Sequence, residues 1–147
     1  RHKLEQLASD LQVADQVTIT GFLPRRDALN LARTADIGVS PFFPSKVLDV
    51  ASPTKLIEYL ALGLPVVANA HPDQSAVLKA CRSGVCVPWG ARHFARAITW
   101  LSHRSDKQLA AMGRRGRDWV LANRSYDRIA DAFEVGCKKA AQSRRVE

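Results

Sequence analysis

The feature that most constrains this fold is a short, wholly apolar segment set between two segments of helical periodicity. Residues 65–68 (PVVA) carry no polar side chain, which is typical of a strand covered on both faces in a parallel sheet. The helix predicted before it begins at Ser52 and Pro53, a good N-cap and a good first helical residue, and Gly63 ends it. Another helix is predicted over 74–80. Together these segments predict a right-handed crossover unit.

The same alternation runs through the rest of the chain. Further strands are predicted over 17–22, 37–40 and 85–87, and further helices over 3–11, 27–35, 93–101, 105–122 and 126–142. Asp27 is predicted to cap the second of these helices. Strands and helices joined by short links predict an α/β fold, a Rossmann-like, doubly wound and mostly parallel sheet with a helical C-terminal tail. At about 100–200 residues per domain, 147 residues make one domain.

The lengths of the apolar runs and the number of cysteines exclude several classes of protein. No apolar run approaches the roughly 20 residues of a membrane-spanning helix. Cys81, Cys86 and Cys137 are odd in number and lack zinc spacing, so we expect reduced, buried thiols. The chain begins at Arg1 without methionine or an apolar leader, and we expect it to be a piece of a longer protein.

The net charge of +8 arises entirely after residue 73, where 15 Lys and Arg face 6 Asp and Glu. Such an excess indicates either an anionic partner or a solvated helical surface. Basic and aromatic residues are not interleaved, and the three Trp are predicted to lie in the core, so we expect no nucleic-acid partner. Nine cations stand between 114 and 145: Arg114, Arg115, Arg117, Arg124, Arg128, Lys138, Lys139, Arg144 and Arg145.

The chain lacks the common phosphate-binding glycine motifs and the serine nucleophile elbow, and its histidines have no metal-ligand spacing. Ligands of parallel sheets bind at the carboxyl ends of strands, here the loops 21–26, 40–54, 69–74 and 88–92. In the second of these loops, Ser52-Pro53-Thr54-Lys55 begins a helix whose free amides and dipole favour an anion. Glu58 follows one turn later, either as an acceptor for a sugar diol or as an exposed partner of Lys55.

Residues 52–69, SPTKLIEYLALGLPVVAN, resemble the donor-site segment of glycosyltransferase family 4, also called glycosyl transferases group 1, which have the GT-B fold. The resemblance covers nearly the whole chain. Residues 17–24 (VTITGFLP) are similar to the family's V-x-F-x-G-x-x-P strand and loop. Residues 34–41 (TADIGVSP) are similar to its A-D-I/V-x-V-x-P strand, and residues 94–97 and 112–126 to its helical tail.

The resemblance implies the donor-binding portion of a retaining, hexosyltransferase-like enzyme. Such an enzyme moves a sugar from a nucleotide-activated donor to a polysaccharide or lipid-linked acceptor. Residues 1–147 would form the C-terminal nucleotide-sugar-binding domain of the GT-B fold, incomplete at its N-terminal side and without the acceptor domain. We expect this piece alone to be inactive, and the resemblance implies no cofactor and no metal.

The resemblance also assigns the donor site residue by residue. Gly21, Phe22 and Leu23 would line the base pocket, and Glu58 would bind the ribose hydroxyls. The amides of Thr54 and Lys55, in the helix begun by Ser52 and Pro53, would face the diphosphate.

Two departures affect the sugar-facing part of the site. Val50 stands where the family has its first acid, with Asp49 beside it as a displaced candidate, and no other catalytic residue is assigned. Residues 70–74 (AHPDQ) replace a Gly-Gly-x-Pro-Glu run, which makes His71 a sugar-facing candidate. Val50 also favours the alternative of a non-catalytic nucleotide-binding or regulatory α/β domain.

The implied partners are the nucleotide sugar, the protein's own acceptor domain and an anionic membrane surface. We expect a cytoplasmic protein, peripheral at the inner face of the membrane. The association is predicted to be electrostatic, since the apolar residues of the tail are predicted to be core contacts: Trp119, Val120, Ile129, Ala130 and Phe133.

Overall fold

A computed structural model of the protein describes residues 1–143 and divides the chain into two compact units, Arg1–Leu31 and a second from Ala32 onward. The first unit contains α1 (His2–Asp10), the short 3-10 helix η1 (Ala14–Gln16) and nearly all of α2 (Arg25–Ala32). Helix α2 begins two residues before Asp27, which lies in its first turn, so the predicted cap is wrong.

The strand predicted over 17–22 is not formed. Val17 has extended dihedral angles (φ −117°, ψ 118°), yet the segment belongs to no strand of the described sheet. An extended segment becomes a strand only when a neighbour takes up its backbone N–H and C=O groups. The β-branched alternation of VTITGF therefore predicts the extended conformation of Val17 correctly and the strand pairing wrongly, and Gly21 departs from extended backbone with φ +71°.

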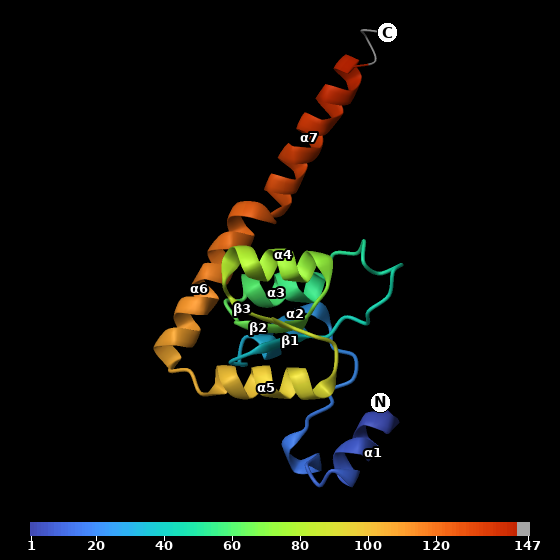
Figure 1. Cartoon of the computed structure of the whole chain (residues 1–147), viewed down its shortest axis with the longest axis vertical. Helices are drawn as coiled ribbons and strands as arrows, with labels where there is room; N and C mark the ends of the chain where they lie inside the picture. Colours follow the sequence, from blue (N-terminus) through green and yellow to red (C-terminus); the bar gives the residue numbers. More distant parts are fainter. Residues whose placement is uncertain (144–147) are drawn as a thin grey trace. The chain divides into compact units, whose positions relative to one another are not determined.

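The second unit is built on a parallel sheet with the order β1-β2-β3, in which Gly38, Val66 and Gly84 are in register. Helices α3 and α4 cover one face and α5 covers the other (Figure 1). The α/β fold class predicted from the sequence is thereby confirmed. The elements are β1 (Gly38–Ser40), α3 (Thr54–Ala61), β2 (Val66–Asn69), α4 (Pro72–Cys81), β3 (Gly84–Val87), α5 (Ala91–Ser102), α6 (Asp106–Asn123) and α7 (Tyr126–Ser143).

Strand β2 lies at the centre of the sheet, and every residue of it is buried. Because successive side chains of a strand point to opposite faces, Val66 and Ala68 join the core formed with α3, α4 and α6. Val67 joins a second core with Ala97 and Leu101 of α5. The apolar character of residues 65–68 follows from this burial on both faces.

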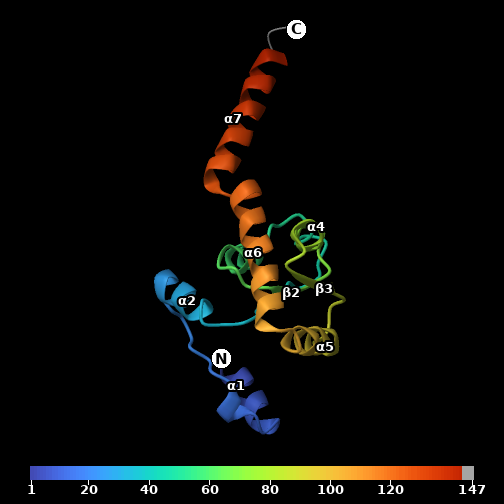
Figure 2. The ribbon, with the colours of Figure 1, turned by 90° about the vertical axis from the view of Figure 1, so that its left-hand side faces the viewer.

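Helix α6 packs beside α3 (Figure 2). Glycines of α6 lie at this contact. A Cβ atom at Gly113 would overlap the carbonyl oxygen of Gly63, and one at Gly116 would lie 2.7 Å from Leu60 Cδ2. Gly63 itself has φ +80° directly after α3, which confirms its predicted role as the end of that helix. The two backbones can be this close only because none of these positions carries a side chain.

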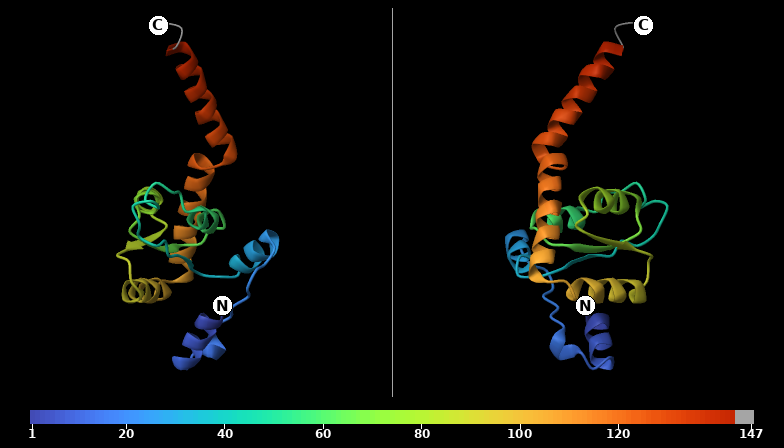
Figure 3. Two further views of the ribbon diagram at one scale, coloured as in Figure 1. Left: turned by 90° about the vertical axis from the view of Figure 1, so that its right-hand side faces the viewer. Right: turned by 60° about the vertical axis from the view of Figure 1, so that its left-hand side comes forward.

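The tail differs from its prediction. Val120 is buried and Trp119 packs against the core, as predicted, but Ile129, Ala130 and Phe133 are exposed. These three lie on α7, which extends away from the sheet (Figure 3). Helical periodicity identifies the apolar face of a helix and does not determine what covers that face. The predicted cations Arg144 and Arg145 lie outside the described residues.

Two of the predicted core tryptophans are also more exposed than expected. Trp89 and Trp100 are each 46 % exposed. Trp100 lies on the outer side of α5, where the Arg104 guanidinium stacks 3.8 Å from the centre of its ring. For Trp100, helical spacing therefore predicts more burial than the structure shows.

The cysteines divide into one buried and two exposed thiols. Cys81 is buried, and desolvation raises the pKa of its thiol. Cys86 and Cys137 are exposed, which corrects the expectation that all three are buried. Within residues 1–143, no group of three or more His, Cys, Asp or Glu could hold a metal ion. Over the same range, no helix is long and apolar enough to cross a membrane.

Candidate functional site

The loop after β1, residues 41–53, is held by side chains at the end of β2 and directly after it. The Asn69 amide pairs with both backbone groups of Phe42, accepting from the N–H at 2.6 Å and donating to the carbonyl at 2.8 Å. Further along, His71 bonds to Leu48, and Asp73 accepts a hydrogen bond from Ser52 at 2.8 Å. The segment 69–73 therefore holds the start, middle and end of the loop by hydrogen bonds.

His71 lies beneath this loop and is only 4 % exposed. Its Nε2 is 2.9 Å from the Leu48 carbonyl oxygen, and because a carbonyl only accepts, Nε2 carries the proton. The Phe42 ring packs edge-on against the imidazole, with ring centroids 4.8 Å apart. Nδ1 is buried and has no hydrogen-bond partner among residues 1–143. A contact of His71 with a sugar remains a prediction.

The start of α3 differs from its prediction in one respect. Pro53 is the N-cap (φ −66°, ψ 104°), and no side chain caps the helix. Ser52, predicted as the cap, lies one residue before the N-cap and makes no cap hydrogen bond. Its hydroxyl donates its proton to the Asp73 carboxylate. The first-turn amides of Thr54 and Lys55 consequently have no side-chain acceptor within the described chain.

Glu58 lies one turn into the same helix and is half-buried, whereas Lys55 is exposed. Tyr59, the next residue, covers the backbone of Gly38 so closely that a Cβ there would lie 2.7 Å from the ring. Strand β1 and α3 are thereby fixed together. A helix start with free amides, a cation and a carboxylate one turn later can bind a phosphate and a diol side by side.

The loop that precedes this helix presents Val50 and Asp49 to solvent. Val50 is 91 % exposed and Asp49 is also exposed, in the turn that follows Ser45. An apolar side chain thus projects from the position where the resembled family has its first acid. Asp49 as a displaced acid remains a prediction.

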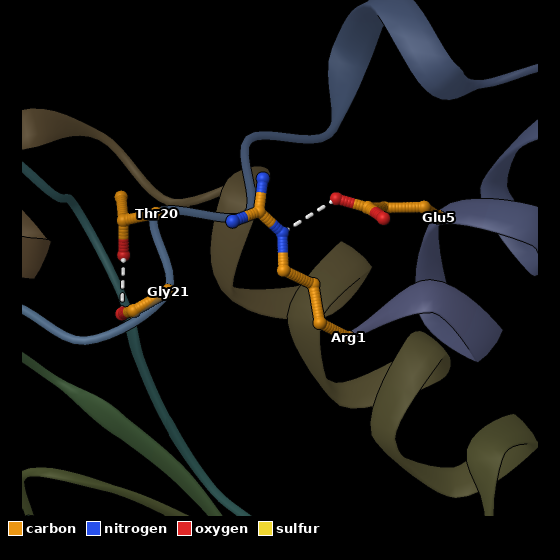
Figure 4. A network of polar contacts seen from close by, with 4 residues as sticks. All are labelled: Arg1, Glu5, Thr20 and Gly21. Carbon is orange, nitrogen blue, oxygen red and sulfur yellow. Dashed lines mark hydrogen bonds and ion pairs between the residues drawn. The ribbon is translucent and has the colours of Figure 1, made fainter.

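Gly21, Phe22 and Leu23 belong to the first unit, which is described by itself. Gly21 has φ +71°, in the left-handed region that favours glycine. Figure 4 shows Thr20 donating to the Gly21 carbonyl at 3.2 Å and Arg1 paired with Glu5 at 2.7 Å. Phe22 is 94 % exposed, and a contact of Gly21, Phe22 and Leu23 with a base remains a prediction.

An apolar cavity of about 310 Å³, which the sequence did not predict, lies at the carboxyl ends of β1 and β3. Trp89 lines it, and Phe43 packs edge-on against Trp89 with centroids 5.8 Å apart. The sequence signal for it was that Pro41, Trp89 and Gly90 lie in two of the four predicted strand-exit loops. Asn69, Asp73 and Arg124 were also missed, because their partners are distant in sequence. The cavity is lined by Val39, Pro41, Trp89, Gly90, Ala91 and Phe94.

Comparison with known families matches residues 1–119 to the family described as glycosyl transferases group 1. The chain belongs to the glycosyl transferases group 1. The match includes the loop 41–53, the segment 69–73 that holds it and all of α3. It ends at residue 119, within α6, so the end of α6, its C-cap Arg124 and α7 lie outside the match.

Two relatives have named functions. WcaL of Escherichia coli (strain K12), named as a colanic acid biosynthesis glycosyltransferase, is 29% identical over 120 residues. The protein of the same name from Salmonella typhimurium (strain LT2) is also 29% identical over 120 residues. In both cases the alignment covers 80% of this chain and 30% of the relative, so this group 1 chain spans about 30% of their length. No solved structure matches the chain.

Proposed function

We propose that this chain is the donor-binding portion of a retaining, hexosyltransferase-like glycosyltransferase. The enzyme would move a sugar from a nucleotide-activated donor to a polysaccharide or lipid-linked acceptor. The observation that carries the proposal is the start of α3, where uncapped amides and Glu58 lie one turn apart inside the segment matched to the family. The names of the two relatives, in colanic acid biosynthesis, favour a polysaccharide product.

Each proposed contact uses a specific group of the chain. The amides of Thr54 and Lys55 would bind the diphosphate, where the positive end of the helix and the Lys55 ammonium oppose its charge. Glu58 would accept hydrogen bonds from the ribose hydroxyls. For the base we keep Gly21, Phe22 and Leu23, and for the sugar Asp49 and His71. We expect no metal cofactor, because amides and a lysine already face the diphosphate in this scheme.

The first test concerns catalysis. We expect the 147-residue chain to turn over no sugar nucleotide, because transfer needs an acceptor held in register with the donor, whereas the longer protein should release nucleoside diphosphate when given donor and acceptor. Chromatography of the released nucleotide, over a panel of uridine and guanosine diphosphate sugars, measures both. Turnover by the 147-residue chain above that of its Glu58→Ala variant would contradict the expected inactivity.

A second candidate function is a non-catalytic nucleotide-binding or regulatory domain. It is favoured by one observation, the exposed Val50 in place of the first acid. The same assay separates the two functions. A longer protein that binds nucleoside diphosphates but transfers no sugar from any donor would support the second function over the first.

We also propose peripheral association of the enzyme with an anionic membrane at its cytoplasmic face. The described charges of α7 balance, three Asp and Glu against three Arg and Lys, so the support comes from the net charge of +8 and the cations of α6. Arg114, Arg115 and Arg117 lie on that helix and are exposed. The exposed Ile129 and Phe133 add apolar area to the attraction.

Vesicle co-sedimentation measures this association. We expect the protein to sediment with anionic vesicles at low salt and to be released at about 1 M salt, where the Debye length is about 3 Å. Retention at high salt would indicate insertion of the apolar face of α7 rather than electrostatic attraction. Equal recovery with neutral and anionic vesicles at low salt would leave the cations as a solvated surface.

A further inference from the structure

Asp73 joins three elements that are far apart in the sequence. One carboxylate oxygen accepts a hydrogen bond from the Ser52 hydroxyl at 2.8 Å, across 21 residues. The other oxygen accepts from the Arg124 guanidinium at 2.6 Å, across 51 residues. The Asp73 side chain is only 20% exposed and that of Arg124 33%. The carboxylate therefore links the end of loop 41–53 to the end of α6.

Both ends of this link are themselves fixed. Asp73 lies in the first turn of α4, where the positive end of the helix stabilises a carboxylate. Arg124 is the C-cap of α6, and its N–H donates to the Val120 carbonyl at 2.8 Å. Because α6 packs against α3 through Gly113 and Gly116, the Arg124 backbone has little freedom to move. A rigid framework thus holds the Asp73 carboxylate in one position.

We propose that Asp73 is a positioning residue for the diphosphate end of the donor site, with Arg124 holding Asp73 in place. Ser52 immediately precedes the Pro53 N-cap, and the amides of Thr54 and Lys55 follow. The bond from Ser52 to Asp73 orients this helix start, while Asp73 itself contacts no donor atom. This inference rests on the proposed donor site. It adds Asp73 and Arg124 as the residue pair that positions the diphosphate end of that site.

The electrostatic effect of Asp73 on diphosphate binding and its positioning effect have opposite signs, so substitutions of Asp73 and Arg124 can distinguish them. Removing the Asp73 charge alone would strengthen the attraction for a diphosphate, whereas loss of positioning weakens binding. The variant Asp73→Ala with Arg124→Ala removes both contacts at unchanged net charge. Ser52→Ala removes only the link to the loop and leaves the ion pair in place. The control is Glu134→Ala with Lys138→Ala, an ion pair of 2.6 Å on α7.

The experiment is an NMR titration of the 147-residue chain with uridine and guanosine diphosphates, and with uridine and guanosine. We expect Ser52→Ala and the Asp73/Arg124 variant each to raise the diphosphate Kd about ten-fold, equivalent to about 1.4 kcal/mol. The Kd of the nucleosides should stay unchanged, because the proposed ribose contact, Glu58, lies one turn further along α3 than the amides of Thr54 and Lys55. The control variant should change neither constant. Equal weakening of nucleoside and diphosphate binding, or unchanged diphosphate binding, would overturn the proposal.

Backbone order parameters separate this inference from the donor site itself. In the wild type we expect values of about 0.85 at the amides of Thr54 and Lys55, falling below about 0.6 in the two test variants and not in the control. If the wild type binds no nucleoside diphosphate, the proposed donor site is refuted. The order parameters alone then decide whether Asp73 positions the start of α3. Unchanged order parameters would show that Asp73 does not position the helix start.

Discussion

Replacing Gly113 with alanine is expected to destabilise the second unit by about 2–3 kcal/mol, at the upper end of the usual cost of overpacking. The new Cβ would overlap the carbonyl oxygen of Gly63. A backbone atom cannot rotate away as a side chain can, so α6 must move off α3 and expose part of the shared core around Leu60 and Val120. Urea unfolding followed by circular dichroism measures the change as a lower midpoint.

A matched control for this substitution lies on α7. Gly136 is also within a long helix, but a Cβ there would meet nothing within 4 Å. Gly136→Ala should therefore stabilise the helix by about 0.5–1 kcal/mol, because alanine loses less conformational entropy than glycine. If both alanine variants shifted the midpoint in the same direction, the close approach of α6 to Gly63 would be wrong.

Replacing Glu58 with glutamine is expected to weaken the binding of nucleoside diphosphates by about ten-fold or more. A hydrogen bond to a charged acceptor contributes about 1.5–3 kcal/mol, and a neutral amide gives up much of that for each ribose hydroxyl. Isothermal titration calorimetry measures the affinity. Glu134→Gln, which changes an exposed carboxylate on α7 in the same way, is the control and should leave the affinity unchanged.

The ligand provides a second control for Glu58. A 2′,3′-dideoxynucleoside diphosphate lacks the hydroxyls that Glu58 is proposed to bind, so the wild type and Glu58→Gln should bind it equally. An unchanged affinity for the ordinary diphosphate would place Glu58 outside the site. An equal loss for both ligands would show that the substitution acts through the fold rather than through the ribose.

The sequence by itself determined the α/β class and the order of the elements in the second unit. The wholly apolar residues 65–68 required a strand buried on both faces, and β2 occupies that position. Gly63 ends α3 with a positive φ, as its residue type indicates. These features could be predicted because periodicity and backbone conformation depend on residues within a few positions of one another. The motif at 52–58 was visible for the same reason.

Only the tertiary structure decided which groups meet. The hydroxyl of Ser52 had a reasonable local role as a helix cap, but a carboxylate 21 residues away binds it instead. Val17 is extended as its neighbours in sequence favour, yet no described strand pairs with its segment. Phe133 follows the helical period of a core residue and is exposed. Caps, strand pairs and core contacts need a partner at a particular place, and that place is set by the packing of elements far apart in the chain.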